Sequence, residues 1–373
     1  MTNTLNIEPL ENWLKDFPKP LVISGPCSAE SEEQLLETAK QLTLLTNVRI
    51  FRAGIWKPRT RAKMFEGVGE IGLQWLRNIK KETGLLTTVE VAKPHHIEAC
   101  LKYGVDILWI GARTAVNPFS IQELAEALKG VDIPVMIKNP VTPDIQLWLG
   151  VIERINQIGI TKIIAIHRGF NTFGKSAYRN EPLWEIPIEL KSLCPNLPVI
   201  CDPSHIAGNK KLLLSVAQKA IDLAMDGLII ESHINPSKAL TDARQQITPE
   251  ELQRLLNQLV YRTSTCEDKN FIANLERFRS EIDRIDEELI NVLSKRMNVV
   301  AKIGKYKKQH NITILQLERW NSILYSRLEL AEKLGIDKSF LLKLLQLVHK
   351  ESIRIQTEIM SKQNKSTTSY HND

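Results

Sequence analysis

The chain has 373 residues, of which 43% are hydrophobic and 25% are charged, as in an ordinary globular protein. Its 49 Lys and Arg residues exceed its 43 Asp and Glu residues only slightly, which argues against a nucleic-acid-binding protein. No apolar run reaches the ~18 residues of a membrane span, and the first residues lack the features of a signal peptide. Five scattered cysteines do not form a disulfide framework, so we expect a cytoplasmic protein with reduced thiols.

The distribution of proline divides the chain. All 17 prolines lie at or before Pro249, and only Gly304 and Gly335 follow Gly227. A chain that loses both helix-breaking residues is expected to continue as long helices. We therefore predict a first domain over 1–262, a polar linker over 263–270, a helical domain over 271–362 and a disordered tail over 363–373.

The first domain alternates short apolar runs with stretches of helical periodicity. Strands are expected at 21–24, 48–52, 86–91, 107–110, 135–138, 163–167, 199–202 and 227–232, and helices between them, for example at 32–45, 145–158 and 210–225. Eight strands, each followed by a helix, in roughly 250 residues indicate a (β/α)8 TIM barrel of the α/β class. A doubly wound open sheet is the alternative, but no G-x-G-x-x-G motif follows the first strand.

The second domain is predicted to be all-α, with three helices at 271–309, 316–334 and 337–362. The first helix carries an apolar stripe that is interrupted at Arg296. At ~1.5 Å per residue this helix is almost 60 Å long, so we expect a second copy of the chain to cover its stripe. Lys307 shares a face with Arg296, and either both side chains reach solvent or they form a dicarboxylate site at a dimer interface.

In a (β/α)8 barrel the active site forms at the carboxyl ends of the strands, and every strand end here carries polar or charged residues. One group comprises Cys27, His205, Glu231 and Asp242. A thiolate, an imidazole and two carboxylates suit a divalent transition-metal ion. Taken alone, Cys27 would more commonly be a buried apolar side chain.

The second group at the strand ends is cationic and comprises Arg52, Lys57, Arg59, Arg113, Lys138 and Arg168. So many cations at one barrel mouth repel one another unless the substrates bring several negative charges. Arginine binds phosphate and carboxylate oxygens in a bidentate manner. These residues therefore predict a metal-assisted enzyme that acts on one or two phosphorylated small molecules.

Eight motifs follow these strands in order: GPCSAE (25–30), FRAGIWKPRT (51–60), IGART (110–114), IKN (137–139), HRG (167–169), CDPSH (201–205), IIESH (229–233) and LTDA (240–243). With them, residues 20–262 resemble the shorter branch of the 3-deoxy-D-arabino-heptulosonate 7-phosphate (DAHP) synthases. The resemblance implies condensation of phosphoenolpyruvate with erythrose 4-phosphate, the first step of the shikimate pathway to aromatic amino acids.

The same resemblance implies roles for the two groups of residues. Cys27, His205, Glu231 and Asp242 would bind the metal, with Mn²⁺ as the expected ion and Fe²⁺, Co²⁺ and Zn²⁺ as alternatives. Arg52, Arg113, Lys138 and Arg168 would hold phosphoenolpyruvate, Arg59 and Thr60 would hold erythrose 4-phosphate, and Lys57 would lie between both substrates.

A sister family, the 3-deoxy-D-manno-octulosonate 8-phosphate (KDO8P) synthases, uses arabinose 5-phosphate instead. That family carries an Asn-Arg pair after the lysine, where this chain has Pro58-Arg59-Thr60. This difference favours erythrose 4-phosphate. Arg61 is an extra cation at a position where DAHP synthases often have serine.

The helical domain contains L-x-x-x-R-x-x-I-x-x-I-D-x-x-L-I-x-x-L-x-x-R (275–296), GKYK (304–307) and a late glutamine at 356. With these motifs, residues 271–362 resemble the all-helical chorismate mutases, which convert chorismate to prephenate without a cofactor. The resemblance implies that Arg279 serves the partner chain's site, that Arg296 and Arg319 bind carboxylates, and that Lys307 and Gln356 contact the ether oxygen.

Two positions depart from the mutase pattern, because Gln316 and Trp320 stand where that family usually has Asp and Glu. An alternative makes the helical domain a non-catalytic dimerisation module that senses prephenate. In the leading interpretation too, we expect prephenate binding to this domain to give allosteric feedback on the synthase. The retained Lys307 and Gln356 favour catalysis. In either case we expect a homodimer or homotetramer formed through intertwined helical domains.

Overall fold

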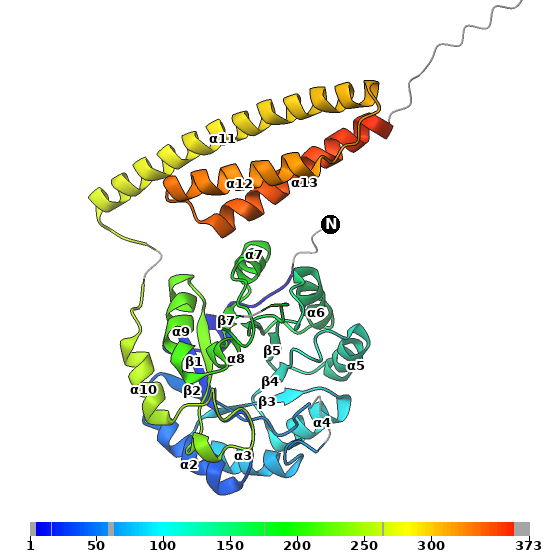
Figure 1. Cartoon of the computed structure of the whole chain (residues 1–373). Coiled ribbons are helices and arrows are strands. Elements are labelled where there is room, and N and C mark those ends of the chain that lie inside the picture. The colour runs from blue at the N-terminus through cyan, green and yellow to red at the C-terminus, as the bar shows by residue number, and fades with distance from the viewer. Residues whose placement is uncertain (1–4, 16, 59–62, 175, 263–264, 362–373) are drawn as a thin grey trace, which may run out of the picture. The chain divides into compact units, whose positions relative to one another are not determined.

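The computed structural model describes residues 5–15, 17–58, 63–174, 176–262 and 265–361. The chain divides into two compact units, Met1–Ser264 and Thr265–Asp373, each of which is described by itself (Figure 1). None of the helices in the described ranges combines the length and the apolar character needed to cross a membrane. The segment predicted as a disordered tail, 363–373, lies outside the described residues.

The first unit contains a closed barrel of eight parallel strands, each paired with its neighbours in chain order. The strands are β1 (Leu21–Gly25), β2 (Val48–Arg52), β3 (Leu86–Val91), β4 (Ile107–Ile110), β5 (Val135–Lys138), β6 (Ile163–His167), β7 (Val199–Cys201) and β8 (Gly227–Glu231). The predicted TIM barrel is confirmed, with every strand end within one residue, and the open sheet is excluded. Strands that are buried on both faces read as continuous apolar runs, which is why the sequence located them.

Except for α1, which precedes β1, the helices of this unit follow the strands and surround the barrel (Figure 1). They are α1 (Leu10–Trp13), α2 (Glu32–Thr43), α3 (Ile71–Thr83), α4 (Pro94–Tyr103), α5 (Pro118–Leu128), α6 (Ile145–Gln157), α7 (Glu185–Leu193), α8 (Pro203–Ala207), α9 (Leu213–Asp222) and α10 (Pro249–Gln258), with short 3-10 turns η1 (Lys210–Leu212) and η2 (Pro236–Lys238). The helix predicted over 210–225 is η1 followed by α9. It ends at Asp222, and Ala224 beyond it takes a left-handed φ of 52°.

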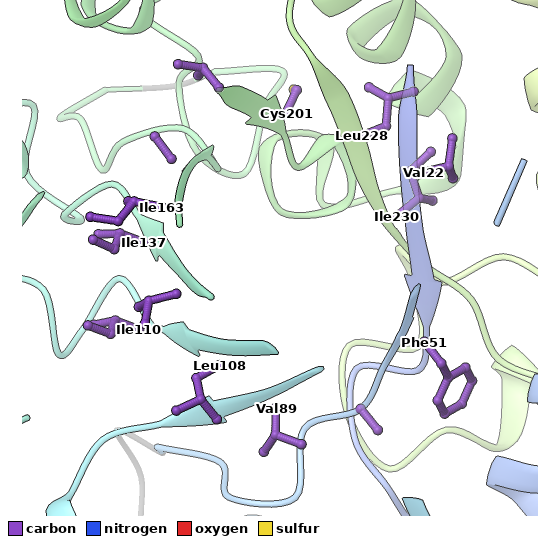
Figure 2. Packing of buried hydrophobic residues seen from close by; sticks show 14 of the residues in the cluster. Val22, Phe51, Val89, Leu108, Ile110, Ile137, Ile163, Cys201, Leu228 and Ile230 are labelled. Atoms are coloured by element: carbon purple, nitrogen blue, oxygen red, sulfur yellow. The ribbon is translucent and has the colours of Figure 1, made fainter. Parts of the chain in front are cut away.

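Alternate residues of each strand face opposite sides and form two layers of core. Ile23, Trp109 and their neighbours fill the barrel interior. Val22, Val89 and the other residues of the outer layer, which Figure 2 draws, pack against the helices. Trp13 and other residues of the N-terminal segment pack against the inner layer. This segment closes the end where the strands begin, so the carboxyl ends of the strands are left for a site.

The second unit contains α11 (Lys269–Gln309), α12 (Leu317–Lys333) and α13 (Lys338–Ser361). Helix α11 begins two residues before its predicted start, because the Asp268 side chain accepts hydrogen bonds from the backbone N–H groups of Asn270 and Phe271. A Cβ added at Gly304 of α11 would lie 3.1 Å from Cγ of Gln356 on α13. Glycine therefore allows these two helices to approach closely.

The apolar stripe of α11 is largely uncovered. Its members Phe278, Ile282, Ile285, Leu289 and Val292 are 49–59% exposed. Globular proteins rarely leave a continuous apolar surface of this length in water, and such surfaces mark interaction sites. The stripe predicted from periodicity is therefore present as an apolar face along the helix.

Candidate active site

Three side chains that could hold a metal ion meet where the first and last strands of the barrel adjoin. Cys27 follows β1, Glu231 ends β8, and Asp242 lies on the loop beyond η2. One ligand atom from each lies within 4.8 Å of the other two, and Cys27 Sγ is 3.5 Å from Asp242 Oδ2. Asp242 adopts a left-handed φ of 48°, a conformation that aspartate tolerates better than most residues.

His205, the fourth predicted ligand, lies on α8 beside this group but is not within 4.8 Å of all three ligand atoms. Its Nε2 is 3.8 Å from Glu231 Oε1, and its Nδ1 is 2.8 Å from Asp202 Oδ2. A carboxylate that holds Nδ1 orients the ring and leaves Nε2 as the coordinating atom. His205 thus faces the group through Glu231.

The ionisable groups of Cys27, Glu231 and Asp242 favour the binding of a cation between them. Burial, together with the charge of Glu231, raises the pKa of the Cys27 thiol to about 12. Although burial acts in the opposite direction, Arg179 lowers the pKa of Asp242 to about 2. Glu231 is fully buried, and its Oε1 has no hydrogen-bond partner among the described residues. A thiol and two carboxylates packed this closely are stabilised by a cation that shares all three.

Two predicted cations lie against the same group. Lys57 Nζ is 2.8 Å from the Cys27 carbonyl oxygen and 3.2 Å from Cys27 Sγ. Arg52 is 1% exposed, and its Nη2 lies 3.2 Å from Glu231 Oε1. The two predicted groups of residues, metal ligands and substrate-binding cations, are therefore in direct contact.

A cavity of 260 Å³ opens beside these residues at the strand ends. Its lining includes five cations, Lys57, Arg113, Lys138, Arg168 and Arg179, together with Glu90, His205 and Asp242. The volume suits small molecules, and the cations suit negatively charged ones. The predicted residues Arg59 and Thr60, and the extra cation Arg61, lie outside the described residues.

Fixed partners hold the cations of this cavity. Lys138 donates to Asp202 Oδ2 at 2.8 Å, and Arg168 donates to Asn180 Oδ1 at 2.8 Å. The exposed Arg113 donates to the Pro58 carbonyl oxygen at 2.6 Å. Burial is the main reason that the pKa of Arg168 falls to about 10. The guanidinium stays charged at neutral pH, and an anionic ligand would relieve the repulsion from neighbouring cations.

A larger cavity of 810 Å³ lies at the opposite end of the barrel, beside the beginnings of β1, β7 and β8. Three cations in its lining are already paired with carboxylates: Lys19 with Glu11, Lys191 with Asp226 and Arg262 with Asp222. No group of three metal-ligating side chains occurs there among the described residues. The smaller cavity at the strand ends is therefore the candidate active site.

Sequence reasoning missed three residues that contact this site. Arg179 lies in the segment before α7, and Gln245 and Gln246 lie on the loop before α10. None directly follows a strand, so a search of strand ends could not find them. Arg179 donates to Asp242 Oδ1 at 3.0 Å, and both glutamines hydrogen-bond to parts of the candidate metal site.

The predicted mutase residues on α11 and α13 lie along the contact between these helices. Arg296 donates to Ser352 Oγ at 2.8 Å, and the buried Gln356 donates to the Ser352 carbonyl oxygen at 3.2 Å. Oε1 of Gln356 has no partner among the described residues. Lys307 donates to the carbonyl oxygen of Ile314 at 2.6 Å.

Two other predicted mutase residues lie apart from that contact. Arg279 is 17 residues from Arg296, which corresponds to ~25 Å along one helix, and it pairs with Glu276 at 2.6 Å. Arg319 is exposed near the start of α12. Arg279 therefore cannot join the other residues within one chain. The substituted Trp320 stacks on His349 of α13, with ring centroids 3.9 Å apart.

These observations define the class of protein. Eight strand ends bring a buried thiol, two carboxylates and a cation-lined cavity to one face of a (β/α)8 barrel. This arrangement is that of a barrel enzyme for small anionic substrates. A separate helical unit carries its own buried glutamine and its own cations.

The chain belongs to the DAHP synthetase I family, whose model matches residues 16–267. Residues 278–357 match the Chorismate mutase type II model. The chain is therefore a bifunctional enzyme with a transferase domain and an isomerase domain, and both predicted resemblances are confirmed. The DAHP synthase family generally uses a divalent metal ion.

Similar proteins match the chain over about the length of its barrel. A phospho-2-dehydro-3-deoxyheptonate aldolase from Thermotoga maritima is 34% identical over 64% of this chain and 68% of its own length. The crystal structure of a Thermotoga maritima enzyme of that name superposes with a TM-score of 0.58 at 35% identity, covering 64% of this chain and 67% of that one. A 2-dehydro-3-deoxyphosphooctonate aldolase from Wolinella succinogenes is 28% identical over 64% of this chain and 98% of its own length.

Proposed function

We propose that the barrel condenses phosphoenolpyruvate with D-erythrose 4-phosphate to DAHP and phosphate, and that the helical domain rearranges chorismate to prephenate. The contact between the Cys27–Glu231–Asp242 group and the cation-lined cavity carries the first half of this proposal, because it puts a metal site beside an anion site. We propose the cytoplasm as the location, in keeping with five free cysteines.

The mixed sulfur, nitrogen and oxygen donors support the proposal of a divalent transition-metal ion. Cys27, His205, Glu231 and Asp242 would hold it, and Mn²⁺ is the proposed ion, with Fe²⁺, Co²⁺ and Zn²⁺ as alternatives. When bound, a divalent ion supplies Lewis acidity to the aldehyde oxygen of the sugar phosphate.

The chain's own residues position the reactants. Arg52, Arg113, Lys138 and Arg168 would bind the carboxylate and phosphate of phosphoenolpyruvate, and Arg59 and Thr60 would bind the sugar phosphate. C3 of phosphoenolpyruvate then bonds to the aldehyde carbon, water adds at C2, and phosphate leaves with cleavage of its C–O bond. Lys57, beside Cys27 and on the cavity lining, can donate a proton to the reacting oxygen.

The acceptor sugar is the first point to test, because relatives named for an eight-carbon product also match this chain. We expect the purified chain to have a higher kcat/KM for erythrose 4-phosphate than for arabinose 5-phosphate, measured as loss of phosphoenolpyruvate. The reason is the Pro58-Arg59-Thr60 segment, although only Pro58 is among the described residues. Preference for arabinose 5-phosphate would replace our assignment with that of the sister synthase.

The helical domain has an alternative function as a module that only dimerises and senses prephenate. Oε1 of Gln356 is buried without a hydrogen-bond partner among the described residues, and both Gln356 and Arg296 bond to Ser352, which suits a polar ligand. The retained pair of Lys307 and Gln356, which a pure sensor would not need, favours catalysis. An assay of chorismate consumption by the purified chain separates the two functions. A chain that binds prephenate but consumes no chorismate is a sensor.

We also propose that the helical domains of two chains intertwine, giving a homodimer or a homotetramer. Ile285→Glu combined with Leu289→Glu is expected to convert dimers to monomers, because it places two charges in the exposed apolar stripe of α11. Light scattering coupled to size-exclusion chromatography measures the mass. Leu44→Glu, at a 79% exposed leucine of the barrel, is the control and should leave the mass unchanged. An unchanged mass for the double variant would contradict dimerisation through this stripe.

A further inference from the structure

Two adjacent buried glutamines contact the residues of the candidate metal site. Gln245 and Gln246 are 1% and 0% exposed, on the loop between Asp242 and Ile247. The backbone N–H of Gln245 donates to the Asp242 carbonyl oxygen at 3.1 Å, and that of Ile247 donates to the Glu231 carbonyl oxygen at 3.1 Å. The backbone of this loop is therefore tied to two of the three candidate ligands.

The side chain of Gln246 connects the loop that carries Cys27 to the loop that carries Asp242. Its Oε1 accepts from the backbone N–H of Cys27 at 2.9 Å, and its Nε2 donates to the carbonyl oxygen of Thr241 at 2.8 Å. Since one partner can only donate and the other can only accept, the orientation of this amide is determined. Gln246 thus sets the separation between Cys27 and the residue next to Asp242.

The side chain of Gln245 contacts the Glu231 carboxylate directly and the Asp242 carboxylate through Arg179. Its Nε2 donates to Glu231 Oε2 at 2.6 Å, and its Oε1 accepts from Arg179 Nη1 at 2.7 Å. The same Arg179 atom donates to Asp242 Oδ1 at 3.0 Å. Gln245 therefore occupies Oε2 of Glu231, so that Oε1, which lies 3.2 Å from Arg52 Nη2 and 3.8 Å from His205 Nε2, is the oxygen that faces the other predicted site residues.

We infer that Gln245 and Gln246 are positioning residues that hold Cys27, Glu231 and Asp242 in the arrangement that binds the metal. This inference rests on the proposed metal site. Turning the Gln246 amide would leave two buried partners unpaired, and turning the Gln245 amide would unpair the buried Glu231 and the exposed Arg179, so the ligand atoms keep their spacing before an ion arrives. Residues that orient metal ligands typically change metal affinity by ~10–100-fold when they are replaced.

The test is a titration of the chelator-treated full chain with Co²⁺, which gives a charge-transfer absorption band when a thiolate binds it. We expect Gln245→Met and Gln246→Met each to raise the Kd for Co²⁺ by at least about tenfold. Gln246→Met should also weaken the thiolate band per bound ion, because Cys27 loses the partner of its backbone N–H. Gln245→Met should keep that band, because it loosens only the carboxylates.

Gln218→Met is the matched control. Gln218 also uses both ends of its amide, with Val260, but it lies on α9 away from the ligands. The Gln218→Met variant should have the same Kd for Co²⁺ and the same thiolate band as the wild type. Thermal unfolding without metal checks that each variant folds. If Gln246→Met does not fold, Gln246→Glu is used instead, and it should retain the thiolate band because it keeps the acceptor for the Cys27 backbone N–H.

Two outcomes separate the inference from the proposed site. If the wild type shows the thiolate band and both methionine variants bind Co²⁺ within about twofold of it, the glutamines do not position the ligands. If the wild type itself shows no thiolate band at saturating Co²⁺, the proposed metal site is wrong, and the inference fails with it.

Discussion

Cys27→Ala is expected to reduce condensation of phosphoenolpyruvate with erythrose 4-phosphate by at least about a thousandfold in kcat/KM, because Lewis-acid activation is worth several kcal/mol. Cys27 is the only sulfur in the candidate metal group among the described residues. Exhaustive treatment with a chelator should have the same effect on the wild type, and added Mn²⁺ should restore only the wild type. Loss of phosphoenolpyruvate measures the rate.

Cys100→Ala is the matched control for this experiment. Cys100 is also a fully buried thiol, but it lies on α4 and packs in the outer core layer. We expect it to lose about 1 kcal/mol of stability and little activity. Undiminished turnover by Cys27→Ala, or by wild type after complete chelation, would refute the metal assignment.

The second large effect concerns the mutase site. Arg279→Ala and Lys307→Ala are each expected to lower chorismate turnover by at least about a hundredfold, because each removes a positive charge that stabilises the transition state. When the two variants are mixed and exchange subunits, about a quarter of wild-type activity should return, since half of the dimers then hold one intact site. The reason is the ~25 Å along α11 between Arg279 and Arg296, which keeps them out of one site within a chain and leads us to propose that Arg279 serves the partner's site.

The control mixture combines Lys307→Ala with Arg296→Ala. Both residues belong to the same chain's part of a site, so no mixed dimer contains an intact one and no activity should return. Subunit exchange is verified with differently tagged chains. If exchange occurs and the first mixture stays inactive, the shared site is refuted.

The positions of the strands and long helices could be predicted because they depend on local signals. β6 is a buried run of isoleucine and alanine that ends in His167, and α11 repeats its apolar residues every three or four positions. Helix ends were predicted less accurately, because a cap such as Asp268 depends on the hydrogen bonds of a single side chain. The short turn η1, which replaces the start of a predicted helix, depends likewise on the Asn209 side chain.

The candidate site could be predicted only where residues directly follow strands. Cys27 and Glu231 lie 204 positions apart, yet the barrel order brings them together, because β8 pairs with β1. Gln245 could not be found in this way. A glutamine in a loop belongs to no periodic pattern, and as an uncharged residue it does not indicate a metal or anion site. Its role depends on where its two partners lie after folding.

The pairing of β1 with β8 also has a consequence for biosynthesis. Domains generally fold from the N-terminus as the chain is synthesised. Cys27 is made early, but the strand and loop that bury it, with Glu231 and Asp242, are made some 200 residues later. We therefore expect the Cys27 thiol to react with oxidants more readily in a chain that ends before β8 than in the complete barrel. Closure by β8 brings Glu231 to the thiol, and the loop that follows brings Asp242.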